Sequence, residues 1–265
     1  MYLFVQRALI SENKAFAQNK DERMKSMYHN YIFDLYGTLV DIRTNEDKSY
    51  LWDKMVELFG FHGAMYERKE LKKAYFSYVK ELEEQMKTKE EYPEIDVQVV
   101  FRRLFEEKGV SVEDSTLVMF QNIFRILSTK FVCLYDGVIE FLEALKKKGK
   151  KIYLLSNAQS NFTRPEIKYL GLEKYFDGIL ISSEEQCKKP GKSFYTKLIE
   201  RYDLNVKESI MIGNDSISDI LGSYEMGMDS LYIHTEISPE CVEDLKSTYT
   251  IMDGDFTKVQ KMILK

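Results

Sequence analysis

Apolar residues are spaced in two different ways along this chain. A short apolar run at 31–33 has the length of a buried strand and ends at Asp34. From about residue 45 to 130 the apolar positions recur at helical spacing, and no strand signal interrupts them. From about residue 132, short apolar runs alternate with helical segments. The pattern therefore predicts a block of helices inserted after the first strand of an alternating β/α unit.

The helical block is predicted to hold four helices. Asp96 is placed to cap the third of them, and Gly109 to end it. The predicted ranges are 51–59, 71–82, 97–105 and 117–127.

The alternating part predicts βαβ units, which imply a parallel sheet with right-handed crossovers. The predicted strands are 31–33, 152–155, 178–181, 210–212 and 230–233, with helices at 138–145, 164–170, 192–202 and 217–226 and a last strand and helix beyond. Several of these strands end in polar residues. Because ligands bind outside the carboxyl ends of parallel strands, we expect the functional residues at that edge.

Composition narrows the classes of function. The chain has 265 residues and is 44% hydrophobic, which suits one large domain or two small ones. A net charge of −5 gives no basic surface for nucleic acid or an anionic membrane, and no apolar run approaches the roughly 20 residues of a membrane span. Cys133, Cys187 and Cys241 are widely spaced and expected to be reduced. We expect a cytoplasmic protein, since the first ten residues are also too polar for a signal sequence.

The end of the first strand is the main candidate for chemistry. Asp34 is placed to react with a ligand, Gly37 permits a tight turn and close backbone approach, and Thr38 adds a hydroxyl and an N–H. A nucleophilic carboxylate also needs a hydrogen-bond donor for the transferred group and a cation against the gathered negative charge. Ser156, at the end of a later strand, is a candidate for the donor, and Lys189 is a candidate for the cation.

The segment 210–219 supplies a third kind of group, because it ends an apolar strand in oxygen-bearing side chains. Asn214, Asp215 and Asp219 carry these side-chain oxygens. Mg²⁺ takes six oxygen ligands and keeps several waters, so one or two carboxylates plus a phosphate suffice. The sequence leaves open which of Asn214 and Asp215 is the ligand.

In this order, the segments resemble the motifs of the haloacid dehalogenase (HAD) superfamily over about residues 30–235. The first motif of that superfamily is D-x-D-G-T, and this chain matches it at Asp34, Gly37 and Thr38. It departs at Tyr36, where phosphatases of the superfamily usually carry a second Asp as general acid/base and 2-haloacid dehalogenases carry Tyr. Lys189 with the following Pro and Ser156 with the preceding apolar strand match two further motifs. Asp219 with either Asp215 or Asn214 resembles the acidic motif of the Mg²⁺-dependent members.

The resemblance implies an α/β fold with a Rossmann-like, three-layer core and an inserted all-helical cap of the C1 type. The domains implied are a core at 30–44 and 131–265, a cap at 45–130 and an N-terminal extension at 1–29. It also implies residue roles. These are catalysis for Asp34, Thr38, Ser156 and Lys189, substrate binding for Tyr36, Gly37 and Asn157, and Mg²⁺ binding for Asp34, the Tyr36 carbonyl, Asn214, Asp215 and Asp219.

Three functions stay open at this point. The favoured one is a Mg²⁺-dependent phosphatase of a small phosphorylated metabolite, with a covalent aspartyl intermediate, because Asp215 and Asp219 provide carboxylate ligands for a metal. Tyr36 favours a metal-free 2-haloacid dehalogenase instead. A non-catalytic protein that binds a metabolite or a partner is the third. The sequence names neither the substrate nor the oligomeric state.

Overall fold

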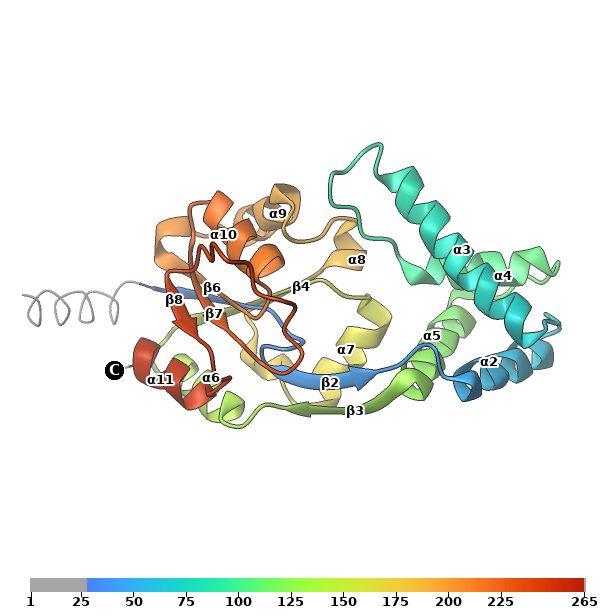
Figure 1. Cartoon of the computed structure of the whole chain (residues 1–265), viewed down its shortest axis with the longest axis horizontal. Coiled ribbons are helices and arrows are strands. Elements are labelled where there is room, and N and C mark those ends of the chain that lie inside the picture. The colour runs from blue at the N-terminus through green and yellow to red at the C-terminus, as the bar shows by residue number, and fades with distance from the viewer. Residues whose placement is uncertain (1–27, 265) are drawn as a thin grey trace, which may run out of the picture.

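The computed structural model describes residues 28–264, so residues 1–27 of the predicted N-terminal extension lie outside the described residues. Six parallel strands form the main sheet in the order β5-β4-β1-β6-β7-β8 (Figure 1). The strands are β1 (Asn30–Phe33), β4 (Lys151–Ser156), β5 (Gly178–Ile181), β6 (Ser209–Gly213), β7 (Asp229–Ile233) and β8 (Tyr249–Ile251). The predicted parallel sheet is confirmed.

Helices cover both faces of this sheet. They are α6 (Val138–Lys147), α7 (Ser160–Tyr169), α8 (Ser182–Glu185), α9 (Lys192–Tyr202), α10 (Gly222–Glu225) and α11 (Phe256–Leu264), with the short segments η1 (Glu173–Tyr175), η2 (Val206–Glu208) and η3 (Ser216–Leu221). Successive strand residues face opposite sides. Phe33 packs with Phe141 of α6 and Phe256 of α11. Its neighbour Ile32 packs with Phe194 of α9, so the core has the three layers that were predicted.

Four further helices form a separate block beside the core (Figure 1). They are α2 (Ser49–Phe61), α3 (Arg68–Met86), α4 (Val97–Glu107) and α5 (Asp114–Ser128). They pack around their own aromatic cluster, in which Phe59, Phe105 and Phe120 lie with ring centroids 4.6–4.9 Å apart. Asp96 caps α4 by accepting from the Gln98 N–H at 2.9 Å, as predicted. The domain boundaries stay a prediction.

Two strands join this block to the core, and neither was predicted. β2 (Val40–Thr44) and β3 (Thr129–Leu134) pair as an antiparallel ribbon (Figure 1). The sequence analysis predicted helices directly after the first motif and did not predict these two strands, which lie at the two ends of the helical block. All six residues of β3 are partly or fully exposed, so this strand lacks the buried apolar run that marks a core strand. The two strands of the ribbon lie on either side of the helical block in the sequence, so local hydrophobic spacing cannot show that they pair.

Polar contacts hold the helical block to the core at two further places. Arg125 of α5 donates from Nε and Nη2 to the Glu166 carboxylate of α7. Before α4, Glu94 accepts from the Ser182 hydroxyl at 2.9 Å. Of the helices in residues 28–264, none combines the length and the apolar character needed to cross a bilayer.

Candidate active site

The loops after β1, β4 and β6 meet at the carboxyl edge of the sheet and enclose a cavity of about 270 Å³. The predicted site residues that line it are Asp34, Tyr36, Asn157, Lys189, Asn214, Asp215 and Asp219. Gly37, Thr38 and Ser156 are buried beside them and do not line it. The structure therefore gathers the residues that the sequence singled out at the edge where we expected them.

A buried ammonium group lies at the centre of this cluster. Lys189 Nζ is 2.7 Å from Asp34 Oδ1 and 2.7 Å from Asp219 Oδ1, and Lys189 is only 2% exposed. Burial alone would lower the pKa of the Lys189 ammonium, but the two carboxylates raise it above its ordinary value. Burial raises the pKa of Asp219 to about 7, although Lys189 opposes that shift. Lys189 is thus held as a cation against Asp34.

The backbone of Lys189 is fixed by the residue that follows β4. Asn157 accepts from the Lys189 N–H and donates to the Lys189 carbonyl, each at 2.9 Å. This pair of bonds occupies the Asn157 amide, which was predicted to bind substrate. Its observed contacts favour a positioning role, and substrate binding stays a prediction.

The turn after Asp34 packs directly on the loop after β6. Thr38 Oγ1 lies 3.4 Å from Asp34 Oδ2 and 3.2 Å from Asn214 Oδ1, so one hydroxyl proton is shared between two acceptors. Gly37 has φ +84°, and a Cβ there would lie 2.2 Å from the Asn214 amide nitrogen. Only glycine fits this position, since both the backbone angle and the close approach exclude a side chain.

Ser156, one of the predicted catalytic residues, has a side-chain hydroxyl without a partner among the described residues. Its hydroxyl is fully buried and makes no hydrogen bond to any described residue. An unpaired buried hydroxyl costs about 1–3 kcal/mol. Because β4 is adjacent to β1, this hydroxyl ends the strand next to Asp34. A ligand oxygen at the cavity would satisfy it.

The two aspartates after β6 are used differently. Asp215 Oδ1 accepts from the N–H groups of Ile217 and Ser218 at the start of η3, and its side chain is half-buried. Asp219 is fully buried, and its second oxygen accepts from the Asp215 N–H at 2.9 Å. Both Asp219 oxygens are therefore occupied, one by Lys189 and one by the backbone.

The donor set can be tested against Mg²⁺. Within residues 28–264, no three His, Cys, Asp or Glu side chains form a cluster that could hold a metal. Asp34, Asn214 and Asp215 nevertheless line one cavity with oxygen-bearing side chains. Mg²⁺ prefers oxygen and takes one or two carboxylates with waters and phosphate oxygens, so these residues fit it.

Tyr36 has its hydroxyl bound to a residue that sequence reasoning missed. The hydroxyl donates to Glu166 Oε2 at 2.5 Å and lies 3.1 Å from Thr163 Oγ1. The Arg125 guanidinium lies 5.4 Å from the Tyr36 ring centroid. Burial, together with the charge of Glu166, raises the pKa of the Tyr36 phenol. No motif marks Arg125 or Glu166, because neither lies near Tyr36 in the sequence.

A loop after β7 completes the cavity and was also missed. Ile237 and Pro239 line it. Thr235 Oγ1 donates to the Gly37 carbonyl at 2.8 Å, and Ser238 Oγ accepts from the Asn214 amide at 3.2 Å. The sequence indicates this loop only by its position, because it follows a predicted strand of the same parallel sheet.

A family model described as a haloacid dehalogenase-like hydrolase matches residues 28–226. The chain belongs to the haloacid dehalogenase-like hydrolases. This confirms the family and the hydrolase class that the motifs predicted.

Relatives of this HAD-like hydrolase include named phosphatases. The glyceraldehyde 3-phosphate phosphatase of Methanothermobacter thermautotrophicus is 26% identical over 133 residues, which cover 49% of this chain and 59% of that protein. The Rhythmically expressed gene 2 protein of Drosophila melanogaster is 27% identical over 227 residues, covering 80% of this chain and 85% of that protein. The 2-haloacid dehalogenase of Pseudomonas syringae pv. Tomato DC3000 shares the fold, with a TM-score of 0.61 at 16% identity over 89% of this chain and 98% of that one.

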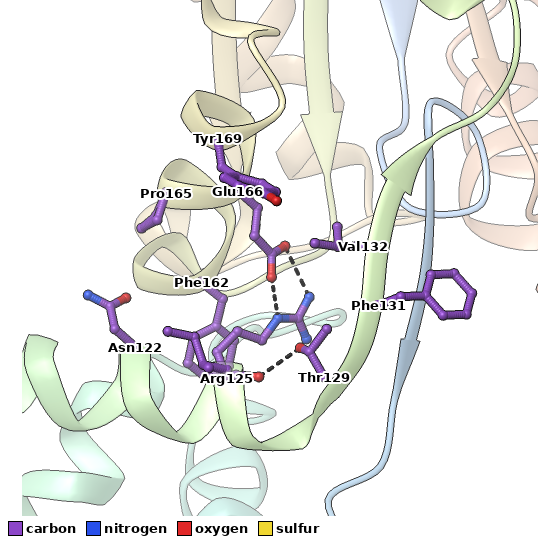
Figure 2. A pocket seen from close by; sticks show the side chains of 10 residues that line it. Asn122, Arg125, Thr129, Phe131, Val132, Phe162, Pro165, Glu166 and Tyr169 are labelled. Carbon is purple, nitrogen blue, oxygen red and sulfur yellow. Dashed lines mark hydrogen bonds and ion pairs between the residues drawn. The ribbon is translucent and has the colours of Figure 1, made fainter.

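This HAD-like hydrolase has a second, larger cavity of about 710 Å³ between α5, β3 and α7. Figure 2 shows the Arg125–Glu166 ion pair crossing it from α5 to α7. Phe162 and the exposed Tyr169 and Ile126 contribute to its mainly apolar walls.

Proposed function

We propose that this HAD-like hydrolase is a Mg²⁺-dependent phosphatase of a small phosphorylated metabolite, with Asp34 as nucleophile. One observation carries the proposal. A single cavity combines a carboxylate paired with a buried ammonium, Asp34 with Lys189, and further oxygen donors on Asn214 and Asp215 that fit Mg²⁺. The phosphatase relative adds support, although the alignment covers 59% of its length.

The proposed reaction has two steps at the Asp34 carboxylate. An Asp34 oxygen attacks phosphorus, the P–O ester bond breaks, and the leaving oxygen takes a proton from water. Water then attacks the aspartyl phosphate, which releases inorganic phosphate and restores Asp34. Lys189 offsets the charge on Asp34 and the phosphoryl group, and the unpaired Ser156 hydroxyl donates to a phosphoryl oxygen.

The metal would be held by Asp34, the Tyr36 carbonyl and Asn214 or Asp215. When bound, Mg²⁺ would neutralise part of the charge on the phosphoryl group. We propose Asp219 as the partner of Lys189 rather than as a ligand, because both of its oxygens are already engaged.

The proposed site lacks a carboxylate acid/base at position 36. The Tyr36 phenol is bound to Glu166, and its pKa is raised, so it is poorly placed to supply the proton. Missing general acid/base catalysis costs typically 10²–10⁴-fold in rate. We therefore expect slow turnover with poor leaving groups and faster turnover with p-nitrophenyl phosphate.

A 2-haloacid dehalogenase is the second candidate, favoured by Tyr36 itself. Displacement of halide from carbon needs no proton for the leaving group and no metal. A binding protein without turnover is the third. For both candidate enzymes the binding partner is a small molecule, and we propose a cytoplasmic location.

The deciding experiment measures phosphate release from p-nitrophenyl phosphate and a panel of phosphorylated metabolites, with Mg²⁺ and with EDTA. We expect turnover that requires Mg²⁺ and disappears in Asp34→Asn, which keeps the size of the side chain and removes the nucleophile. Halide release from 2-haloacids in EDTA, without phosphate release, would select the dehalogenase. Stabilisation by beryllofluoride with Mg²⁺ and no turnover of either kind would select a binding protein.

A further inference from the structure

The loop 235–239 gives the cavity a fixed apolar wall. Ile237 and Pro239 form this wall. The two hydrogen bonds described above fasten the loop to the turn after Asp34 and to the loop after β6. Just beyond the wall, the Val242 N–H donates to Ser216 Oγ at 3.3 Å. The wall is thus attached to the same loops that carry the candidate nucleophile and metal ligands.

The charge in this cavity is unbalanced. Asp34, Asp215 and Asp219 contribute carboxylates, whereas Lys189 is the only cation among the described residues that line it. Both hydrogen bonds from Lys189 go to these carboxylates. The proposed phosphoryl group and its metal already use this cation and the free carboxylate oxygens. A second anionic group on a substrate would find no positive partner in the lining.

Arg125, the cation beside Tyr36, does not change this charge balance. The Arg125 guanidinium lies over the Tyr36 ring, on the side of the larger cavity. Its Nε and Nη2 atoms are 2.6 and 3.2 Å from the two oxygens of Glu166. Its charge is thus already paired with a carboxylate through two hydrogen bonds.

We infer that the site selects compact phosphate monoesters whose leaving group carries no further negative charge, and that Ile237 determines this selectivity. The inference rests on the proposed phosphatase function. A second carboxylate or phosphate would lie against an apolar wall and three carboxylates, with Lys189 already bound to two of them, which is costly. The volume of about 270 Å³ lies below the ~300–1,000 Å³ of common ligand pockets, which limits the size of the leaving group.

The test compares two substrates that differ in one group. Glycerol 3-phosphate and 3-phosphoglycerate have the same three-carbon frame, but the second carries a carboxylate in place of a hydroxymethyl group. We expect kcat/KM for glycerol 3-phosphate to exceed that for 3-phosphoglycerate by at least about tenfold. Ile237→Lys adds a cation to the wall and should lower this ratio by at least about tenfold.

Two further variants make the result specific. Ile126→Lys places the same charge on an exposed side chain of α5 and should leave the ratio at its wild-type value. Pro239→Lys adds a cation to the same wall at an exposed position. It tests the role of the wall even if Ile237→Lys does not fold.

The outcomes separate the inference from the function on which it rests. Hydrolysis of p-nitrophenyl phosphate that depends on Asp34, together with a wild-type ratio near one, overturns the selectivity and leaves the phosphatase proposal intact. If Ile237→Lys and Pro239→Lys fold and keep the wild-type ratio of kcat/KM values, the apolar wall does not determine the selectivity. If the wild-type protein shows no Asp34-dependent phosphate release from any substrate, the selectivity and the phosphatase proposal are both overturned.

Discussion

Two cavities of this hydrolase differ both in size and in the chemistry of their walls. The cavity at the carboxyl edge of the sheet measures about 270 Å³ and is lined by three carboxylates and an ammonium group. The cavity between α5, β3 and α7 measures about 710 Å³ and has mainly apolar walls. Volume alone would favour the second, but only the first holds groups that can attack, neutralise charge and bind a metal. Chemistry, rather than size, identifies the candidate active site.

Tyr36 connects the two cavities. Tyr36 lines the smaller one, while its hydroxyl binds Glu166, which lines the larger one beside Arg125. If this connection is only structural, changes in the smaller cavity alter activity and changes in the larger one do not. Substitutions in each cavity therefore test whether only the smaller one affects activity.

The largest effect is expected from removing the ammonium group in Lys189→Met. This change leaves Asp34 and Asp219 buried together without a cation, so we expect phosphate release to fall by at least about 10²–10³-fold. We also expect a loss of about 3–5 kcal/mol in the free energy of unfolding, because a buried charge loses its partner. Phosphate release and urea unfolding measure the two effects.

The stability loss in Lys189→Met should depend on pH. Burial already raises the pKa of Asp219 to about 7, and removing Lys189 raises it further. The folded variant then keeps a proton that the unfolded chain loses above about pH 4, so its stability falls as pH rises through that range and past 7. Urea unfolding in EDTA should show a greater loss relative to wild type at pH 8 than at pH 5. An equal loss at both values contradicts this account.

The next effect concerns the unpaired hydroxyl of Ser156. Ser156→Ala should lower phosphate release by about 10²-fold, because the hydroxyl is free to donate only to the ligand. Its free energy of unfolding should stay level or rise by up to about 1 kcal/mol, since an unsatisfied buried group is removed.

Ser230→Ala is the matched control for that change. Ser230 also has a buried, unpaired hydroxyl, but it lies at the start of β7, whereas Ser156 ends β4 at the carboxyl edge of the sheet, where the cavity lies. The two variants should have similar melting temperatures and differ only in activity. Equal activity in both would remove Ser156 from the proposed mechanism.

The sequence predicted those parts of the molecule that depend on local pattern. The strands that end at Asp34 and Ser156 have continuous apolar runs, and the parallel sheet followed from their alternation with helices. The β2–β3 ribbon could not be read in this way, because its strands are half exposed and pair across the helical block.

The same limit applies within the site. Motif spacing placed the charged groups of the cavity, whereas the bond from Tyr36 to Glu166 spans 130 residues and leaves no local trace. Ile237 was missed because an apolar residue in a polar loop carries no signal until the loop is folded against the site.

A smaller effect is expected in Tyr36→Phe. If the phenol acts as a general acid, its loss should cost 10²–10⁴-fold in kcat. We expect less than about a tenfold change, because the hydroxyl is bound to Glu166. The free energy of unfolding should fall by about 1.5–3 kcal/mol, since a hydrogen bond to a charged group is lost. Tyr28→Phe removes a similar 2.5 Å bond to Asp229 away from the site and is the control for stability.

The smallest effect is expected in the larger cavity. Tyr169 is 79% exposed on its rim, so Tyr169→Ser should change the free energy of unfolding by no more than about 0.5 kcal/mol. Phosphate release should stay within twofold of wild type, because Tyr169 has no described contact with the groups of the smaller cavity. A tenfold or greater fall in kcat with an unchanged melting temperature would contradict the contrast between the cavities. It would mean that the apolar cavity acts on the site through Arg125, Glu166 and Tyr36.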